Sequence, residues 1–128
     1  MRKIVLVEDN EDLLESTAEI LELKGYAVQI ANNGKKGLAL AKSSKPDLII
    51  SDIMMPKMDG YEMLEELRAD ATTAMIPFIF LTAKAQKTDI LRGAVSGADR
   101  YLTKPFTMAE LVKNVEEIMN CLPLKPKR

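Results

Sequence analysis

Three acidic residues stand where two apolar runs end, and their placement suggests a metal site. Glu8 and Asp9 follow the apolar residues 4–7, and Asp52 follows residues 48–51. A short, β-branched run that stops at a carboxylate is typical of a buried parallel strand whose tip opens into a site. If the two strands are neighbours, each like-charge pair at ~4 Å costs about 4 kcal/mol at an effective dielectric of ~20. Such a cluster persists only with a bound cation or a retained proton, and we expect a cation.

Two further polar residues follow apolar runs later in the chain. Thr82 comes after residues 77–81, and Lys104 comes shortly after residues 100–102. Hard carboxylate oxygens suit Mg²⁺, which keeps part of its water shell. A lysine ammonium and a threonine hydroxyl can both contact phosphoryl oxygens. The set predicts a phosphoryl-transfer site in which a carboxylate is the nucleophile.

Each of these residues also has a structural interpretation when it is taken alone. The first acidic pair could favour a helix start, Thr82 could be an ordinary strand residue, and Lys104 could be a solvated loop lysine. Their combination favours a functional site. In contrast, Asp59 and Gly60 are expected to form a turn or a helix cap, and Asp12 is expected to face solvent.

Strand-like and helix-like periods alternate five times along the chain. The expected strands are 3–7, 27–31, 48–51, 77–81 and 100–102, and the expected helices are 11–24, 35–42, 60–69, 87–96 and 107 to about 122.

Local signals mark several boundaries of these elements. Asn10 is placed to cap the first helix, and Gly25 suits a left-handed residue after its end. Asn33 and Gly34 supply turn chemistry before the second helix. Thr107 begins a T-x-x-E capping box at the last helix.

This alternation predicts an α/β fold: one doubly wound (βα)5 domain with a five-stranded parallel sheet of order 2-1-3-4-5. In that order the first and third strands are neighbours. Ligands bind outside the carboxyl ends of such strands, where the acidic residues fall. We expect residues 1–122 to form this domain and residues 123–128 to be a short basic tail or the start of a linker.

The composition of the 128-residue chain narrows the classes of function. With 47% hydrophobic residues, 29% charged residues and a formal net charge of -1, it resembles a globular domain with no electrostatic bias toward nucleic acid or membranes. Cys121 is the only cysteine, so no internal disulfide can form, and we expect a passive small hydrophobe there. No apolar run approaches the ~20 residues of a membrane helix, and the N-terminus lacks a signal-peptide pattern. We expect a cytoplasmic location.

The ordered motifs resemble those of receiver domains of two-component response regulators, of the chemotaxis-regulator type. They are V-E-D-N at 7–10, D-I-M-M-P-x-M-D-G at 52–60, L-T-A at 81–83 and Y-L-T-K-P-F at 101–106. The resemblance covers residues 3 to about 122.

The resemblance implies that Asp52 accepts a phosphoryl group from the phosphohistidine of a histidine kinase. Glu8, Asp9 and Asp52 would then hold Mg²⁺ together with the backbone carbonyl of Met54. The chain contains no histidine, so it cannot itself be the phosphohistidine donor. The domain would not be an enzyme in the ordinary sense, although it would assist its own phosphorylation and dephosphorylation.

The same resemblance implies that Thr82 and Lys104 contact the phosphoryl oxygens and that Thr82 and Tyr101 move inward together on phosphorylation. The peptide between Lys104 and Pro105 is expected to be cis. Expected partners are a sensor histidine kinase or phosphotransfer protein, and a downstream protein on the face of the fourth helix, fifth strand and fifth helix. A homodimer that forms on phosphorylation is a further expectation. We expect the domain to make no direct contact with nucleic acid or membrane.

Two rival functions remain open at this point. The first is a pure interaction module that binds a partner without being phosphorylated, against which the complete set of acids, threonine and lysine argues. The second is a flavin carrier on a related fold, against which the lack of a Ser/Thr-rich phosphate loop and of tryptophan argues.

Overall fold

The computed structural model of the chain describes residues 1–82 and 98–121. The predicted helix 87–96, the residues Ala83 and Lys84 that follow the L-T pair, and the basic tail lie outside the described residues.

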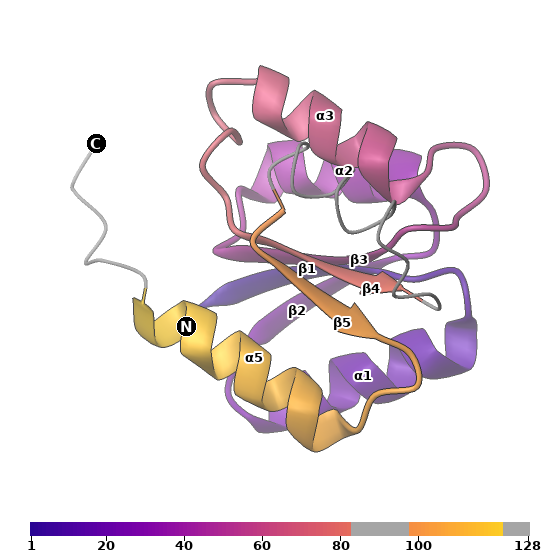
Figure 1. Ribbon diagram of the computed structural model, residues 1–128. Coiled ribbons are helices and arrows are strands. Elements are labelled where there is room, and N and C mark those ends of the chain that lie inside the picture. The colour runs from indigo at the N-terminus through magenta and orange to yellow at the C-terminus, as the bar shows by residue number, and fades with distance from the viewer. Residues whose placement is uncertain (83–97, 122–128) are drawn as a thin grey trace.

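Five strands and four helices make up the described part of the chain (Figure 1). In chain order they are β1 (Lys3–Val7), α1 (Glu11–Leu23), β2 (Ala27–Ala31), α2 (Gly34–Ser44), β3 (Leu48–Asp52), α3 (Gly60–Ala69), β4 (Phe78–Thr82), β5 (Arg100–Thr103) and α5 (Met108–Cys121).

The strands form one parallel sheet in the order β2-β1-β3-β4-β5, which confirms the predicted topology. The register pairs Val7 of β1 with Ser51 of β3 and Asp52 with Leu81 of β4. Because all strands run in one direction, their carboxyl ends meet at a single edge of the sheet. The residues that follow β1 and end β3 therefore lie side by side.

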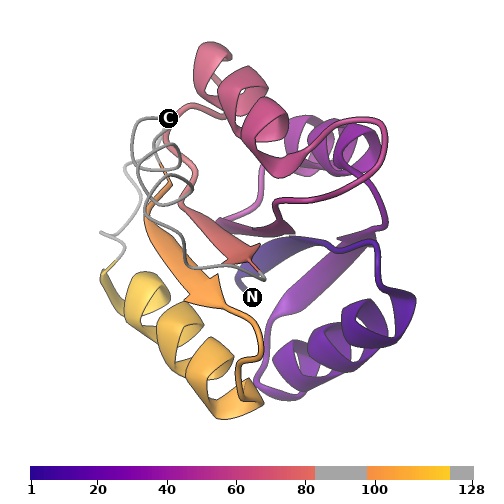
Figure 2. The same cartoon turned by 45° about the vertical axis from the view of Figure 1, so that its right-hand side comes forward.

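Helices cover both faces of the sheet, α1 and α5 on one and α2 and α3 on the other (Figures 1 and 2). Side chains along β1 alternate between the two faces of the sheet. Ile4 and Leu6 lie in the core under α1 and α5, whereas Val5 and Val7 lie in the core under α2 and α3. All four side chains are fully buried. This explains why the central strands read as continuous apolar runs without polar alternation.

The strand boundaries differ from the predicted ones at the functional edge. Asp52, Thr82 and Thr103 are the last residues of β3, β4 and β5, whereas the sequence placed each of them just beyond its strand. Asp52 pairs with Leu81 in the ladder and Thr82 pairs with Thr103. The backbone pairing thus holds two of the site residues inside the rigid sheet rather than in loops.

Capping residues fix the helix ends as the sequence predicted. The Asn10 side chain accepts a hydrogen bond from the Leu13 amide, and Gly25 has a left-handed φ of 97°. The Thr107 hydroxyl accepts a hydrogen bond from the Glu110 amide at 3.0 Å. The second helix, Gly34–Ser44, is longer than the predicted 35–42, and a left-handed Lys45 follows its end.

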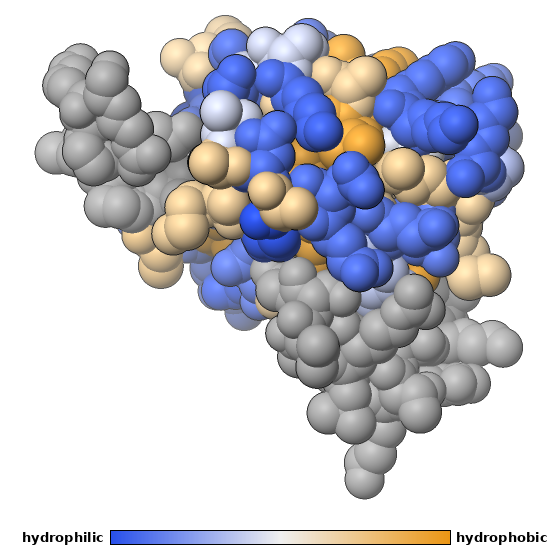
Figure 3. All heavy atoms as spheres, turned by 90° about the horizontal axis from the view of Figure 1, so that it is seen from above, coloured by the Kyte–Doolittle hydropathy of each residue, from blue (hydrophilic) through white to orange (hydrophobic). Residues whose placement is uncertain are grey.

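The helices are apolar toward the sheet and polar toward solvent. Seen from the α3 side, the surface is mostly hydrophilic with a small hydrophobic area (Figure 3). Cys121 is exposed, and whether its thiol is passive stays a prediction. It comes last in α5, where the helix face has turned outward. Within the described ranges, no helix has the length and apolar character that a membrane crossing requires.

Candidate phosphoryl-transfer site

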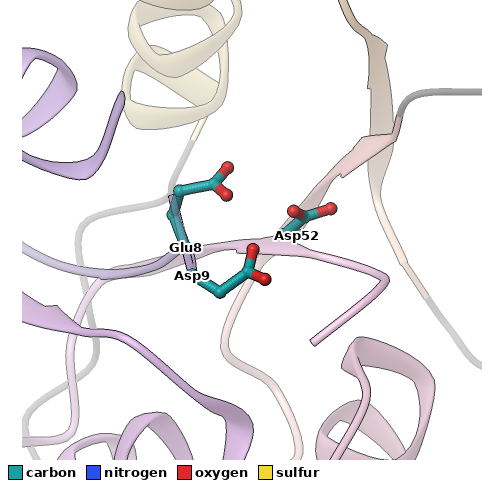
Figure 4. A group of neighbouring side chains, drawn as sticks. All are labelled: Glu8, Asp9 and Asp52. Carbon is teal, nitrogen blue, oxygen red and sulfur yellow. The ribbon is translucent and has the colours of Figure 1, made fainter. Parts of the chain in front are cut away.

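The three predicted acidic residues meet at the carboxyl edge of the sheet. One carboxylate oxygen from each of Glu8, Asp9 and Asp52 lies within 4.8 Å of the others, and the three side chains gather between the ends of β1 and β3 (Figure 4). Glu8 and Asp52 are 1% and 7% exposed, whereas Asp9 is exposed. Three hard oxygen donors at this spacing could hold a divalent cation.

Lys104 reaches this acidic cluster from the loop after β5. Its ammonium donates hydrogen bonds to Glu8 Oε1 at 2.8 Å and to Asp52 Oδ2 at 3.1 Å. The Lys104 amide also donates to the Thr82 carbonyl, which ties its loop to the end of β4. The peptide between Lys104 and Pro105 is cis. The Lys104 ammonium therefore bridges two of the three carboxylates, those of Glu8 and Asp52, and both are buried.

Backbone amides hold the two buried carboxylates in place. The Ile53 amide donates to Asp52 Oδ1 at 2.8 Å, and the Asn10 amide donates to Glu8 Oε2 at 3.1 Å. No sequence pattern predicts either contact, because any residue except proline supplies a backbone amide. Both carboxylates thus have one oxygen on a backbone amide and one on Lys104.

Burial dominates the electrostatics of Glu8. Desolvation raises the pKa of Glu8 to about 7 from its usual 4.5, against the lowering effect of the hydrogen bonds from Lys104 and Asn10, and the nearby charge of Asp52 also raises it. The pKa of Lys104 is raised as well: burial favours its neutral form, but the hydrogen bond to Glu8 and the charge of Asp52 outweigh that effect.

Thr82 lies on β4, the strand next to that of Asp52, and Tyr101 lies on β5, one strand further from the acidic cluster. Thr82 ends β4 and is 6% exposed, one position beyond Leu81, the ladder partner of Asp52. Tyr101 is partly buried on the α3 side of the sheet, with its ring centroid 5.5 Å from that of Phe80. The hydroxyl and the aromatic ring therefore come from adjacent strands, and it is the strand of Thr82 that pairs with the strand of Asp52.

The loop of residues 53–59 leaves the site directly from Asp52 and carries the exposed Met54. Asp59 and Gly60 end it as a helix cap: the Asp59 side chain accepts from the Glu62 amide in a capping box at the start of α3. Gly60 has a second role that the sequence did not reveal. A Cβ atom on Gly60 would lie 2.5 Å from the Asp52 carbonyl oxygen, so only glycine lets α3 begin this close to the acidic residue.

The arrangement as a whole suits phosphoryl transfer. It joins a buried carboxylate, a set of oxygens that could hold a cation, an ammonium and a hydroxyl, and such sites act through positioning and charge neutralisation.

Comparisons with known proteins agree with this chemistry. A family model described as response regulator receiver domain matches residues 4–116. The transcriptional regulatory protein RprY of Bacteroides fragilis is 45% identical over 117 residues, covering 91% of this chain and 49% of its own length. Protein PilH of Pseudomonas aeruginosa is 38% identical over 119 residues, covering 93% of this chain and 98% of its own length. The chain thus spans about half of one curated relative and nearly all of another.

Solved structures show the same fold. The receiver domain of sensor histidine kinase PA1611 from Pseudomonas aeruginosa superposes with a TM-score of 0.85 at 32% identity, over 93% of this chain and 98% of that one. That crystal structure is described as having a magnesium ion coordinated in the active site cleft.

Proposed function

The chain belongs to the response regulator receiver domain family of two-component signal transduction, and on that basis we propose that Asp52 accepts a phosphoryl group from the phosphohistidine of a histidine kinase. One observation carries this assignment: Asp52 is the buried carboxylate that both an acidic pair and a lysine ammonium approach, the latter at 3.1 Å.

Glu8, Asp9 and Asp52 would hold Mg²⁺ together with the backbone carbonyl of Met54. The donor set fits this ion, because three carboxylate oxygens within 4.8 Å of one another leave room for the waters that Mg²⁺ retains. When bound, the ion would neutralise negative charge on the transferring group.

The residues of the chain have separate roles in the proposed transfer. A carboxylate oxygen of Asp52 forms a bond to phosphorus while the P–N bond of the phosphohistidine breaks, and the electron pair of that bond returns to the imidazole nitrogen. Lys104 would turn from the carboxylates to the phosphoryl oxygens, and the Thr82 hydroxyl would donate to another of them. Water would later attack the same phosphorus while the P–O bond to Asp52 breaks, which restores the Asp52 carboxylate and releases phosphate. The domain is thus a phosphoacceptor that assists its own turnover rather than an enzyme acting on a separate substrate.

Phosphorylation would add about −1.5 to −2 charge units at this site, which favours inward movement of Thr82 and Tyr101. The surface that changes on phosphorylation would comprise β5, α5 and residues 87–96, the last of which lie outside the described residues. Its partner would be a downstream protein or a second phosphorylated copy of the chain. Residues 1–122 would form the receiver domain, with 123–128 as a tail or linker start.

Incubation with Mg²⁺ and acetyl phosphate, followed by intact mass spectrometry, tests the proposal. We expect the wild-type chain to gain one phosphoryl group, Asp52→Asn to gain none and chelation of Mg²⁺ to prevent the gain. Asp59→Asn is the matched control, because asparagine keeps the helix cap and should leave the gain intact.

A pure interaction module on the receiver fold predicts a different result. If the wild-type chain gains no phosphoryl group from this donor or from a phosphorylated histidine kinase, the phosphoacceptor function is wrong and the interaction module is favoured.

A further inference from the structure

The loop between β3 and α3, residues 53–59, is held at its base by the backbone itself. The Gly60 amide donates to the Ile53 carbonyl at 2.8 Å, which closes the loop just beyond Asp52. A tight turn follows inside it, where the Met58 amide donates to the Pro56 carbonyl at 2.8 Å and Lys57 has a φ of 71°. These two hydrogen bonds restrict the conformation of the loop. Its position then depends on the contacts made by the side of the loop away from Asp52.

The far side of the loop lies against Gly34, the first residue of α2. A Cβ atom on Gly34 would lie 2.2 Å from the Met58 carbonyl oxygen and 2.9 Å from its carbonyl carbon. Real Cβ atoms essentially never come within 3.0 Å of such atoms. Gly25 is the glycine with a positive φ in the described chain, so Gly34 is needed for close approach rather than for backbone freedom.

The first turn of α2 is a rigid support for this contact. Asn33 caps it: its buried side chain accepts from the Lys36 amide at 2.9 Å, and its carbonyl accepts from the Gly37 amide at 3.0 Å. A Cβ atom on Gly37 would lie 2.6 Å from Val7 Cγ2, so the same turn also lies directly against the end of β1. It thus contacts both segments that lead to the acidic cluster.

We propose that Gly34 is a positioning residue for the divalent-cation site. By letting the Met58 carbonyl lie against α2, it would fix the loop whose Met54 carbonyl is the proposed fourth protein ligand. This inference rests on the proposed function, because Met54 matters only if its carbonyl is a ligand. It extends the site to α2, an element that supplies none of the proposed ligands.

Gly34→Ala tests the inference, with Mg²⁺ affinity measured by isothermal titration calorimetry. The added methyl group must push Met58 away from α2, and we expect Mg²⁺ to bind about tenfold or more weakly, as for other residues that orient metal ligands. Excess Mg²⁺ should then restore most of the phosphorylation rate with acetyl phosphate. This separates a displaced ligand from a damaged acceptor.

Gly25→Ala is the matched control. Its positive φ makes alanine strained there, whereas nothing lies within 4 Å of the added atom, so the chain should lose stability yet keep wild-type Mg²⁺ affinity. A folded Gly34→Ala variant with unchanged affinity would overturn the inference. If the wild-type chain itself binds no Mg²⁺, the proposed metal site fails instead.

A measurement on the wild-type chain covers the case in which Gly34→Ala does not fold. Coupling is reciprocal, so Mg²⁺ binding should slow hydrogen exchange of the Lys36 and Gly37 amides in the first turn of α2. The Lys24 and Gly25 amides at the opposite edge of the sheet should change little. Equal responses of the two pairs of amides would contradict the inference.

Discussion

Glu8 combines near-complete burial with a position between a lysine and two other acids. Its pKa is raised to about 7, chiefly by desolvation, so the folded chain binds a proton more tightly than the unfolded chain does. The stability that this proton contributes is fully present below the unfolded pKa near 4.5 and is lost as the pH rises through about 7.

We therefore expect the Mg²⁺-free chain to become less stable between about pH 4.5 and about pH 7, by at most roughly 1.4 kcal/mol per pH unit. Urea unfolding across this range measures the slope. The chain has no histidine, which removes the side chain that most often titrates there. Glu8→Gln should flatten the dependence of the free energy of unfolding on pH, whereas Glu15→Gln, at an exposed position, should not. Equal pH dependence for wild type and Glu8→Gln would show that Glu8 does not titrate near neutral pH.

Lys104 neutralises part of the charge that would otherwise attract a divalent ion. In Lys104→Met we expect Mg²⁺ to bind more tightly, by about tenfold or ~1.4 kcal/mol, because two buried carboxylates lose their ammonium partner. Without Mg²⁺ the variant should be less stable by roughly 1–3 kcal/mol, and its phosphorylation should be slow because a phosphoryl contact is lost.

Calorimetric titration with Mg²⁺ and urea unfolding check the two effects of this change. Lys113→Met, the same substitution at an exposed position of α5, serves as the control. Weaker Mg²⁺ binding in Lys104→Met would mean that Lys104 orders the site rather than competing for its oxygens.

For the secondary-structure elements, the sequence predicted whether each is a helix or a strand better than it predicted the first and last residues. Periodicity found all nine described elements, and the residues Asn10, Gly25 and Thr107 marked helix ends because their side chains or backbone have specific roles there. Strand ends were missed by a residue, since ladder pairing continues through polar residues such as Asp52 and Thr82. Hydrophobic patterns cannot report a pairing that the backbone alone makes.

The last helix offers a test of capping at this scale. Thr107→Ala removes the hydroxyl that accepts from the Glu110 amide, so we expect a loss of about 1 kcal/mol in the free energy of unfolding. Urea denaturation measures it, with the exposed Glu116→Gln on the same helix expected to change stability by about 0.5 kcal/mol or less. A Thr107→Ala variant as stable as wild type would show that the start of α5 is held by its packing alone.

At the scale of the molecule, strand order creates the site. Lys104 and Glu8 are 96 positions apart in the chain, yet Lys104 Nζ lies 2.8 Å from Glu8 Oε1, because parallel strands bring their carboxyl ends to one edge of the sheet. That convergence could be predicted from motifs and topology. The support of the loop by Gly34 could not, since a glycine in a turn-like sequence looks the same whether it serves a turn or a close approach.

Glu8, Asp9 and Asp52 are proposed to surround one divalent cation at this edge of the sheet. Anomalous diffraction from crystals grown with Mn²⁺ in place of Mg²⁺ tests it most directly. We predict a single peak within direct coordination distance of the Asp9 and Asp52 carboxylates, with Lys104 turned away from at least one of its two acidic partners. The absence of a peak there, with Lys104 still bridging Glu8 and Asp52, would contradict the account.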